Sequence, residues 1–114
     1  MHELSIALSI VELAEEEAAE RSVRVTAVHL KLGRLSGVVR DALLASYEMA
    51  AEGTALAGSR LVIEDIPVLG FCPGCNARRT LEGAVWFVCP VCESPISEIV
   101  AGRELEVYAL EIRE

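Results

Sequence analysis

The sequence contains few aromatic residues and few cations. Only 4% of its 114 residues are aromatic although 53% are hydrophobic, so its core has to be built from aliphatic side chains. Ten Lys and Arg residues stand against eighteen Asp and Glu residues, which gives a formal net charge of −8. Nucleic acids are held largely through cationic contacts to phosphates. We therefore expect no nucleic-acid partner.

The chain also lacks long hydrophobic runs. No stretch reaches the roughly eighteen uninterrupted apolar residues of a membrane-spanning helix. The N-terminus has no Lys or Arg before its apolar stretch, and Glu3 and Glu12 interrupt that stretch, so it does not match a secretory signal. We expect a cytoplasmic protein with no membrane partner. In that compartment the four cysteines are more readily metal ligands than disulfides.

The residue sets of common enzyme classes are absent as well. There is no glycine-rich phosphate loop and no nucleophile elbow, and the whole chain has only two histidines. An enzyme of acyl or phosphoryl transfer would have little with which to work. The sequence therefore predicts a protein that is not an enzyme.

Hydrophobic periodicity predicts a mixed α and β domain. Apolar residues recur at helical spacing with a wide apolar face over 4–20 and again over about 39–51. β-branched and alternating residues predict three strands, at 23–33, 60–66 and 103–113. The fold class is therefore α+β, with a three-stranded sheet and two helices.

Several positions within these elements carry finer expectations. Ser36 is a candidate N-cap for the second helix, and Gly53 is placed to end it. The alternation of the first strand breaks near Ala27 and Val28, which predicts a bulge or a change in the covered face. His29 falls on the polar face of that strand, where a histidine is usually solvated.

Residues 68–101 differ in composition from the rest of the chain. They hold all four cysteines, three of the four prolines and the only tryptophan. Because a strand of the main sheet follows them, they form an insertion. We therefore divide the chain into a discontinuous α+β domain, 1–67 and 102–114, and an inserted domain, 68–101.

The cysteines form two C-P-x-C knuckles, Cys72 to Cys75 and Cys89 to Cys92, separated by thirteen residues. Two such knuckles supply the four tetrahedral sulfurs that structural Zn²⁺ takes at ~2.3 Å. A four-sulfur site has no open position, so the metal would support folding rather than catalysis. Iron in a rubredoxin-like electron carrier, a redox dithiol and a disulfide pair in a secreted protein remain open alternatives.

The residues around the knuckles allow further expectations. Asn76, after the first knuckle, tolerates left-handed backbone, whereas Glu93, after the second, suits it less. Arg78 and Arg79 are expected in solvent on a hairpin. Of the two aromatic residues before the second knuckle, Trp86 and Phe87, we expect one to pack on the knuckles and the other to be exposed.

The chain starts MHELS, with a histidine directly after the initiator methionine. The Met1 amine, the His2 amide nitrogen and the His2 imidazole can close a five-membered and a six-membered chelate ring on one metal. Deprotonated amide ligands favour square-planar Ni²⁺ or Cu²⁺ over Zn²⁺. The Glu3 amide or carboxylate can fill a further position. The alternative is that His2 lies by accident on a frayed chain end.

Together these motifs resemble the HypA/HybF family of nickel metallochaperones. The resemblance is carried in order by MHELS, by VHLKLGRLSGV at 28–38, by the two C-P-x-C knuckles and by GREL at 102–105. It extends over essentially the whole chain. Asn76 and Glu93 depart from it, because glycine commonly follows each knuckle in that family.

The resemblance implies a function in maturation of [NiFe]-hydrogenase, and in some members also of urease. It implies a transient nickel site at Met1, His2 and Glu3. It implies a structural zinc site in a zinc ribbon at four cysteines: Cys72, Cys75, Cys89 and Cys92. The implied partners are a HypB-type GTPase and the hydrogenase large-subunit precursor. The oligomeric state stays open, with a homodimer as one candidate.

Two alternative functions from other classes remain. The second hypothesis is a zinc-ribbon interaction module without a second metal, and the third is a rubredoxin-like electron carrier. The third is distinguished by colour, because iron at four thiolates is red and zinc is colourless.

Overall fold

The computed structural model describes residues 2–82 and 87–114. Two helices and six strands follow one another in these residues: α1 His2–Arg21, β1 Arg24–Gly33, α2 Arg40–Ala51, β2 Arg60–Ile66, β3 Val68–Cys72, β4 Ala77–Leu81, β5 Glu98–Ala101 and β6 Leu105–Arg113. The strands form two three-stranded sheets, in the orders β2-β1-β6 and β4-β3-β5. The predicted α+β class, with two helices and a three-stranded sheet formed by the first, second and last strands, is confirmed.

The chain divides into two compact units. The helical unit contains Met1–Lys31, Val38–Glu64 and Glu106–Glu114, and the cysteine unit contains Leu32–Gly37 and Asp65–Leu105. The cysteine unit is thus larger than the insertion proposed from composition. The added turn segment is held within it by backbone bonds, from Gly33 N to Glu104 O at 2.8 Å and from Leu35 N to Gly102 O at 2.6 Å.

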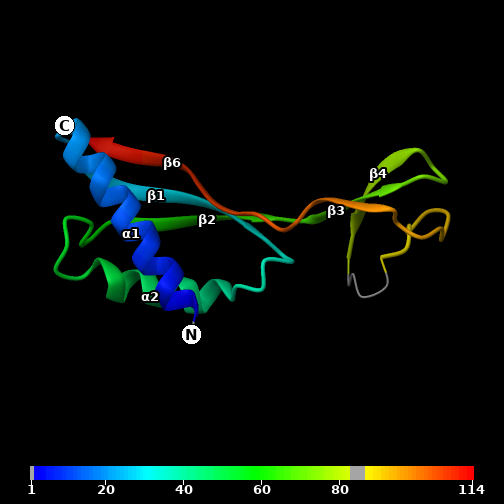
Figure 1. Ribbon diagram of the computed structural model, residues 1–114, viewed down its shortest axis with the longest axis horizontal. Coiled ribbons are helices and arrows are strands. Elements are labelled where there is room, and N and C mark those ends of the chain that lie inside the picture. The colour runs from blue at the N-terminus through cyan, green and yellow to red at the C-terminus, as the bar shows by residue number, and fades with distance from the viewer. Residues whose placement is uncertain (1, 83–86) are drawn as a thin grey trace. The chain divides into compact units, whose positions relative to one another are not determined.

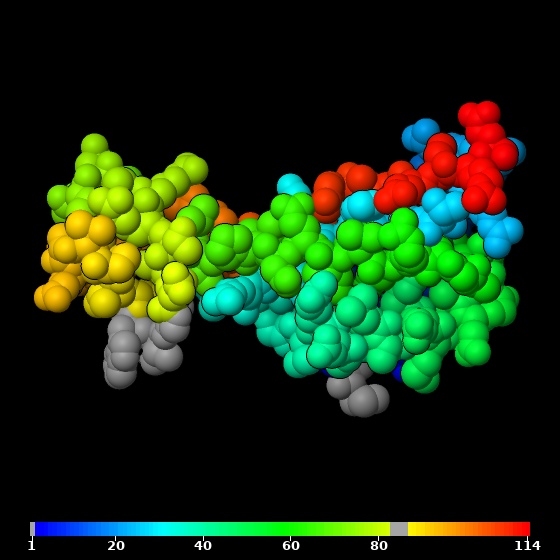
Figure 2. Space-filling model, turned by 180° about the vertical axis from the view of Figure 1, so that it is seen from behind, coloured from blue at the N-terminus to red at the C-terminus, as the bar shows by residue number. Residues whose placement is uncertain are grey.

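In the helical unit, α1 and α2 pack together and cover one face of the β2-β1-β6 sheet (Figure 1). β1 and β2 run in the same direction with α2 connecting them, while β6 runs the opposite way. Figure 2 shows the strands of this sheet from behind, with α2 in turquoise below them. Ala7, Ala14 and Ala18 are buried on α1, and such small side chains let a helix approach its neighbours closely. Leu8 and Leu13 are 51% and 47% exposed, so the apolar face of α1 is narrower than predicted.

The start of α2 differs from the prediction. Val39, not Ser36, occupies the N-cap position, and no side chain caps the helix from there. The prediction was wrong because the helix begins at Arg40, too far along the chain for the Ser36 hydroxyl to cap its first turn. The Glu3 carboxylate instead accepts the Val39 N–H at 3.2 Å. Gly53 follows the helix with a φ of 73°, as predicted for its C-terminal end.

The break in the alternation of β1 is confirmed. Ala27 and Val28 are both fully buried, so the covered face changes its phase between them. His29 and Lys31 then lie on the opposite side and are half-buried. None of the described helices is long and apolar enough to cross a membrane.

In the cysteine unit, β3 is the central strand and pairs antiparallel with β4 and β5. Val68, Gly70 and Cys72 alternate into the interior of this unit. A Cβ at Gly70 would lie 2.5 Å from Ile96 Cγ2 and 2.9 Å from Leu81 Cδ1, so a larger residue there would force these side chains to shift. The strand therefore directs Cys72, at its end, into a tightly packed interior.

Candidate metal centres

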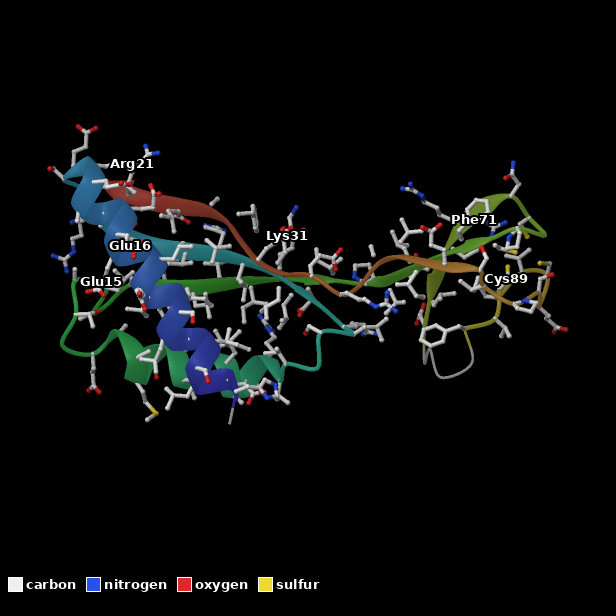
Figure 3. All side chains as sticks on the ribbon, viewed as in Figure 1. Glu15, Glu16, Arg21, Lys31, Phe71 and Cys89 are labelled. Atoms are coloured by element: carbon white, nitrogen blue, oxygen red, sulfur yellow. The ribbon has the colours of Figure 1, made fainter. Side chains whose placement is uncertain are left out.

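The four predicted cysteine ligands come together in one cluster. Their sulfur atoms all lie within 4.8 Å of one another, with Cys72 Sγ 3.4 Å from Cys92 Sγ and Cys75 Sγ 3.9 Å from Cys89 Sγ. Figure 3 shows sulfur atoms gathered around the labelled Cys89. A tetrahedron with metal–sulfur bonds of ~2.3 Å has sulfur–sulfur edges of about 3.8 Å. The cluster therefore fits a tetrahedral four-sulfur metal ion.

Both knuckles are formed by the same backbone turn. The Cys75 N–H points to Cys72 Sγ at 3.4 Å, and the Val91 and Cys92 N–H groups point to Cys89 Sγ at 3.4 and 3.5 Å. Asn76 and Glu93 both adopt left-handed backbone, with φ values of 52° and 64°. Glu93 thus completes the turn although its side chain is poorly suited to it.

Gly74 lets the two knuckles approach each other. A Cβ at this position would lie 2.9 Å from Ser94 Oγ and 3.3 Å from Cys92 Sγ. The Ser94 hydroxyl is itself 3.3 Å from Cys92 Sγ, where it can donate to a thiolate. A larger residue in place of Gly74 would therefore displace the Ser94 hydroxyl from its position beside Cys92.

The cluster is prepared to hold negative charge, but not on every sulfur at once. N–H groups of Cys92 and Val91 lower the pKa of Cys89 to about 6. The Cys75 N–H lowers the pKa of Cys72, but burial and the neighbouring thiols outweigh it and raise that pKa to about 11. Four thiolates at this spacing repel one another unless a cation lies between them. The donor set therefore fits a thiophilic cation such as Zn²⁺ or iron.

Arg79 belongs to this site, whereas the sequence placed it in solvent. The side chains of β4 alternate, so Arg78 is exposed while Arg79 lies on the inner face with the buried Leu81. The Arg79 Nε atom is buried without a hydrogen-bond partner in the described structure. Contact with the thiolates of Cys75 and Cys89 raises the pKa of Arg79. The alternation in ARRTL was the sequence signal that could have identified it.

Phe87 is half-buried and adopts a φ of 49°. Trp86 lies outside the described residues, so the expectation that one of these two aromatics packs on the knuckles stays a prediction.

The second predicted set of ligands lies at the start of α1. Met1 lies outside the described residues, but His2 and Glu3 already belong to the first turn of the helix rather than to a frayed end. The His2 side chain is 65% exposed and the Glu3 side chain 14%, with His2 Nε2 3.9 Å from Glu3 Oε2. The Val39 N–H lowers the pKa of the Glu3 carboxyl.

The two histidines therefore have different surroundings. His2 is open to solvent at the chain end. His29 Nε2 lies 2.6 Å from Glu111 Oε2 on the neighbouring strand β6. His29 is thus half-buried and paired within the sheet, whereas the sequence favoured a solvated histidine.

Comparison with known proteins points to one family. A family model described as hydrogenase/urease nickel incorporation, metallochaperone, hypA, matches residues 1–112. The hydrogenase maturation factor HypA of Chloroflexus aurantiacus is 57% identical over 112 residues, which cover 97% of this chain and 98% of that protein. HypA of Geobacter metallireducens is 43% identical over 112 residues, covering 98% and 99%.

Solved structures show the same relationship. The solution structure of a HypA protein superposes with a TM-score of 0.73 at 25% identity, covering 99% of this chain and 97% of the other. That of the Ni metallochaperone HypA from Helicobacter pylori gives a TM-score of 0.65 at 25% identity, covering 98% and 97%. The chain belongs to the HypA family of hydrogenase/urease nickel-incorporation metallochaperones, which are maturation factors and not enzymes.

Proposed function

We propose that this protein binds Ni(II) at its N-terminus and delivers it during maturation of [NiFe]-hydrogenase, and also of urease where that enzyme is present. The family match over residues 1–112 is the observation that carries the proposal. The exposed imidazole of His2, at the start of α1, also supports it, because it is an accessible nitrogen ligand.

The helix start offers suitable ligands for the nickel cargo. We assign binding to the Met1 amine, to the amide nitrogen and imidazole of His2, and to Glu3. The first N–H groups of an α-helix have no acceptor within the helix. An amide nitrogen there can therefore release its proton to solvent and bind the metal in its place, without breaking a helical hydrogen bond.

The same position favours release. A helix N-terminus carries a partial positive charge that opposes a bound cation. The bond from Val39 N to Glu3 Oε2 also brings the start of α2, a second such terminus, close to Glu3. The carboxylate of Glu3 offsets part of this charge. A site that is exposed and only partly compensated suits a cargo that is to be passed on.

We further propose that the four-cysteine cluster holds Zn²⁺ in a structural role. The ligands would be Cys72, Cys75, Cys89 and Cys92, and a bound zinc would cross-link the two knuckles. Because four sulfurs close the coordination shell, no step of nickel transfer passes through this metal. Iron in a rubredoxin-like carrier would fit the same sulfurs, and a red colour of the purified protein would identify it.

The partners follow from the proposed delivery. We propose a HypB-type GTPase, the hydrogenase large-subunit precursor and a homodimer as assemblies of this chain, with no nucleic acid and no membrane among its partners. The free thiols of the cluster suit the reducing cytoplasm. In this proposal residues 1–67 and 102–114 form the nickel-binding domain, and residues 68–101 form the zinc-binding domain.

The test is nickel calorimetry on the chain with its native N-terminus. His2→Ala and N-terminal acetylation should each weaken nickel binding by about tenfold or more, which is about 1.4 kcal/mol. Binding should also weaken as the pH falls, because a protonated amine or imidazole cannot ligate. Glu3→Gln keeps an acceptor for Val39 and should cost less if its carboxylate only balances charge.

Two outcomes would contradict the proposal. Equal nickel affinity of the acetylated and the free chain would rule out the terminal chelate. No measurable nickel binding, with one zinc per chain retained, would favour the zinc-ribbon interaction module without a second metal.

A further inference from the structure

Three arginines gather at one end of the sheet in the helical unit. Arg24 is the first residue of β1, Arg60 is the first of β2 and Arg113 is the last of β6. All three line one surface hollow of about 430 Å³, together with the loop at 57–59. The beginnings of β1 and β2 and the end of β6 lie together in Figure 2. We call this hollow the arginine groove.

The stability of the sheet does not explain this arrangement. The Thr26 hydroxyl donates to Glu111 O at 3.2 Å, so these residues are neighbours on β1 and β6. Arg24 lies two positions before Thr26 on β1, and Arg113 lies two positions after Glu111 on β6, so the two arginines stand at the same end of the antiparallel pair. Like charges on adjacent strands repel each other and destabilise a sheet.

The cations of the groove are also poorly compensated. Arg60 Nη2 lies 3.6 Å from Glu111 Oε1, and Glu111 is shared with His29. Within the described ranges, Arg24 and Arg113 form no ion pair. The chain has only ten basic residues against eighteen acidic ones, yet three of the ten line one hollow. A cost in stability without internal compensation is expected where a surface binds something.

A second hollow adjoins the groove and extends the surface. It has a volume of about 580 Å³, shares residues 57–60 with the arginine groove, and is lined on its other side by Glu48, Met49 and Glu52. Met49 is 64% exposed, and a flexible thioether adapts to many apolar partners. Glu48 and Glu52 repel carboxylates, so the acidic side chains of a ligand belong in the arginine groove itself. An adjoining apolar side chain of the same ligand can contact Met49, and such a two-part contact suits an extended chain better than a single small anion.

We propose that the arginine groove is a docking site for an acidic, carboxylate-bearing segment of a partner protein. A guanidinium group binds a carboxylate through two parallel hydrogen bonds, and three such groups from separate strands can hold successive acidic side chains. In a chain of net charge −8 the groove is also a local attractive patch that steers an acidic partner to one end of the sheet. This inference goes beyond nickel delivery and does not depend on it.

The test uses hexaglutamate as the probe and amide chemical shifts of the metal-loaded full-length chain as the readout. Shifts should concentrate at residues 24–26, 57–60 and 111–113. The double variant Arg24→Gln with Arg113→Gln should lose about tenfold or more in affinity. The control is Arg78→Gln with Arg103→Gln, which removes the same charge from exposed positions of the cysteine unit and should stay within about twofold of the wild type.

The remaining outcomes distinguish the proposal from its alternatives. The melting temperature of the groove variant should stay level or rise, because a repulsion is removed. A lower melting temperature would mean that the arginines are structural. Inorganic phosphate giving the same shifts at equal concentration would make the groove a small-oxyanion site. Absent shifts, shifts elsewhere, or equal loss in the control would each overturn the assignment.

Discussion

Arg79 completes the set of donors around the four sulfurs. Cys72 and Cys89 accept backbone N–H groups of their own knuckles, and Cys92 lies beside the Ser94 hydroxyl. Among the described residues Cys75 accepts no backbone N–H, and Arg79 is the group beside it. Four thiolates and one Zn²⁺ carry two negative charges, so a neighbouring cation offsets part of the surplus.

The residue-scale prediction is that Arg79 positions the thiolates for metal binding. Arg79→Gln should lower metal affinity by about tenfold or more, as is usual for partners of metal ligands. The measurement is competition with a chelator at several pH values. Because a lost cation makes thiolate formation harder, the deficit should grow as the pH falls.

Arg79→Lys keeps the charge and should recover part of the affinity, whereas Arg78→Gln on the exposed face should leave it unchanged. If Arg78→Gln and Arg79→Gln weaken the metal equally, net charge alone matters and the positioning role is wrong.

At the scale of elements, α2 is anchored by one fully buried leucine. Leu43 is 0% exposed, while Met49 on the same helix is 64% exposed. Leu43→Ala should lower the free energy of unfolding by about 2–5 kcal/mol, because the cavity it leaves adds to the lost burial. Met49→Ala should change it by less than about 0.5 kcal/mol. Urea denaturation of both variants gives the comparison, and similar midpoints would show that Leu43 is not a core residue.

The contact between β1 and β6 predicts a dependence on pH. The hydrogen bond with His29 lowers the folded-state pKa of Glu111 below its ordinary value of 4.5. A depressed carboxyl pKa contributes stability above the unfolded pKa, and this contribution is lost as the pH falls through the folded value. The free energy of unfolding should therefore fall less for Glu111→Gln than for the wild type when the pH is lowered from about 5 to 3, as measured by denaturation at each pH.

Glu106→Gln is the matched control, because Glu106 is exposed on the same strand and has no ion pair within the described part of the chain. If acid lowers the free energy of unfolding equally in Glu111→Gln and in the wild type, Glu111 does not contribute to the pH dependence.

Local patterns predicted the elements well, since the periods of 3.6 and 2 are properties of neighbouring residues. The change of phase at Ala27 and Val28 and the left-handed turn at Asn76 were likewise visible in the sequence, whereas the same turn at Glu93 was not expected from its side chain. The start of α2 was not visible in the sequence, because the Val39 N–H donates to the Glu3 carboxylate, which lies 36 positions away along the chain. For Arg79 the alternation in ARRTL indicated that Arg78 and Arg79 lie on opposite faces of β4, but not which of these faces the sulfurs occupy.

At the scale of the whole molecule, the two units are interleaved along the chain. The chain passes from one unit to the other after Lys31, after Gly37, after Glu64 and after Leu105. β1 and α2 of the helical unit are therefore joined by a segment of the cysteine unit. Each unit nevertheless has buried residues of its own.

This connectivity shapes the expected result of removing the metal. In the cysteine unit the buried residues include the ligands Cys72 and Cys89 themselves, so the proposed zinc supplies much of its folding free energy. In Cys72→Ala, or after chelation, residues 65–105 should lose hydrogen-exchange protection. The segment 32–37 should lose it too, because its bonds to Gly102 and Glu104 lie in the same unit. α1 and α2 should keep their hydrogen-exchange protection, since their packing does not involve the sulfurs.

Val91→Ala is the control, because Val91 lies inside the second knuckle but is 66% exposed. Native protection of 65–105 in the metal-free protein would show that the metal is not structural. Loss of protection in α1 and α2 as well would show that the two units fold as one.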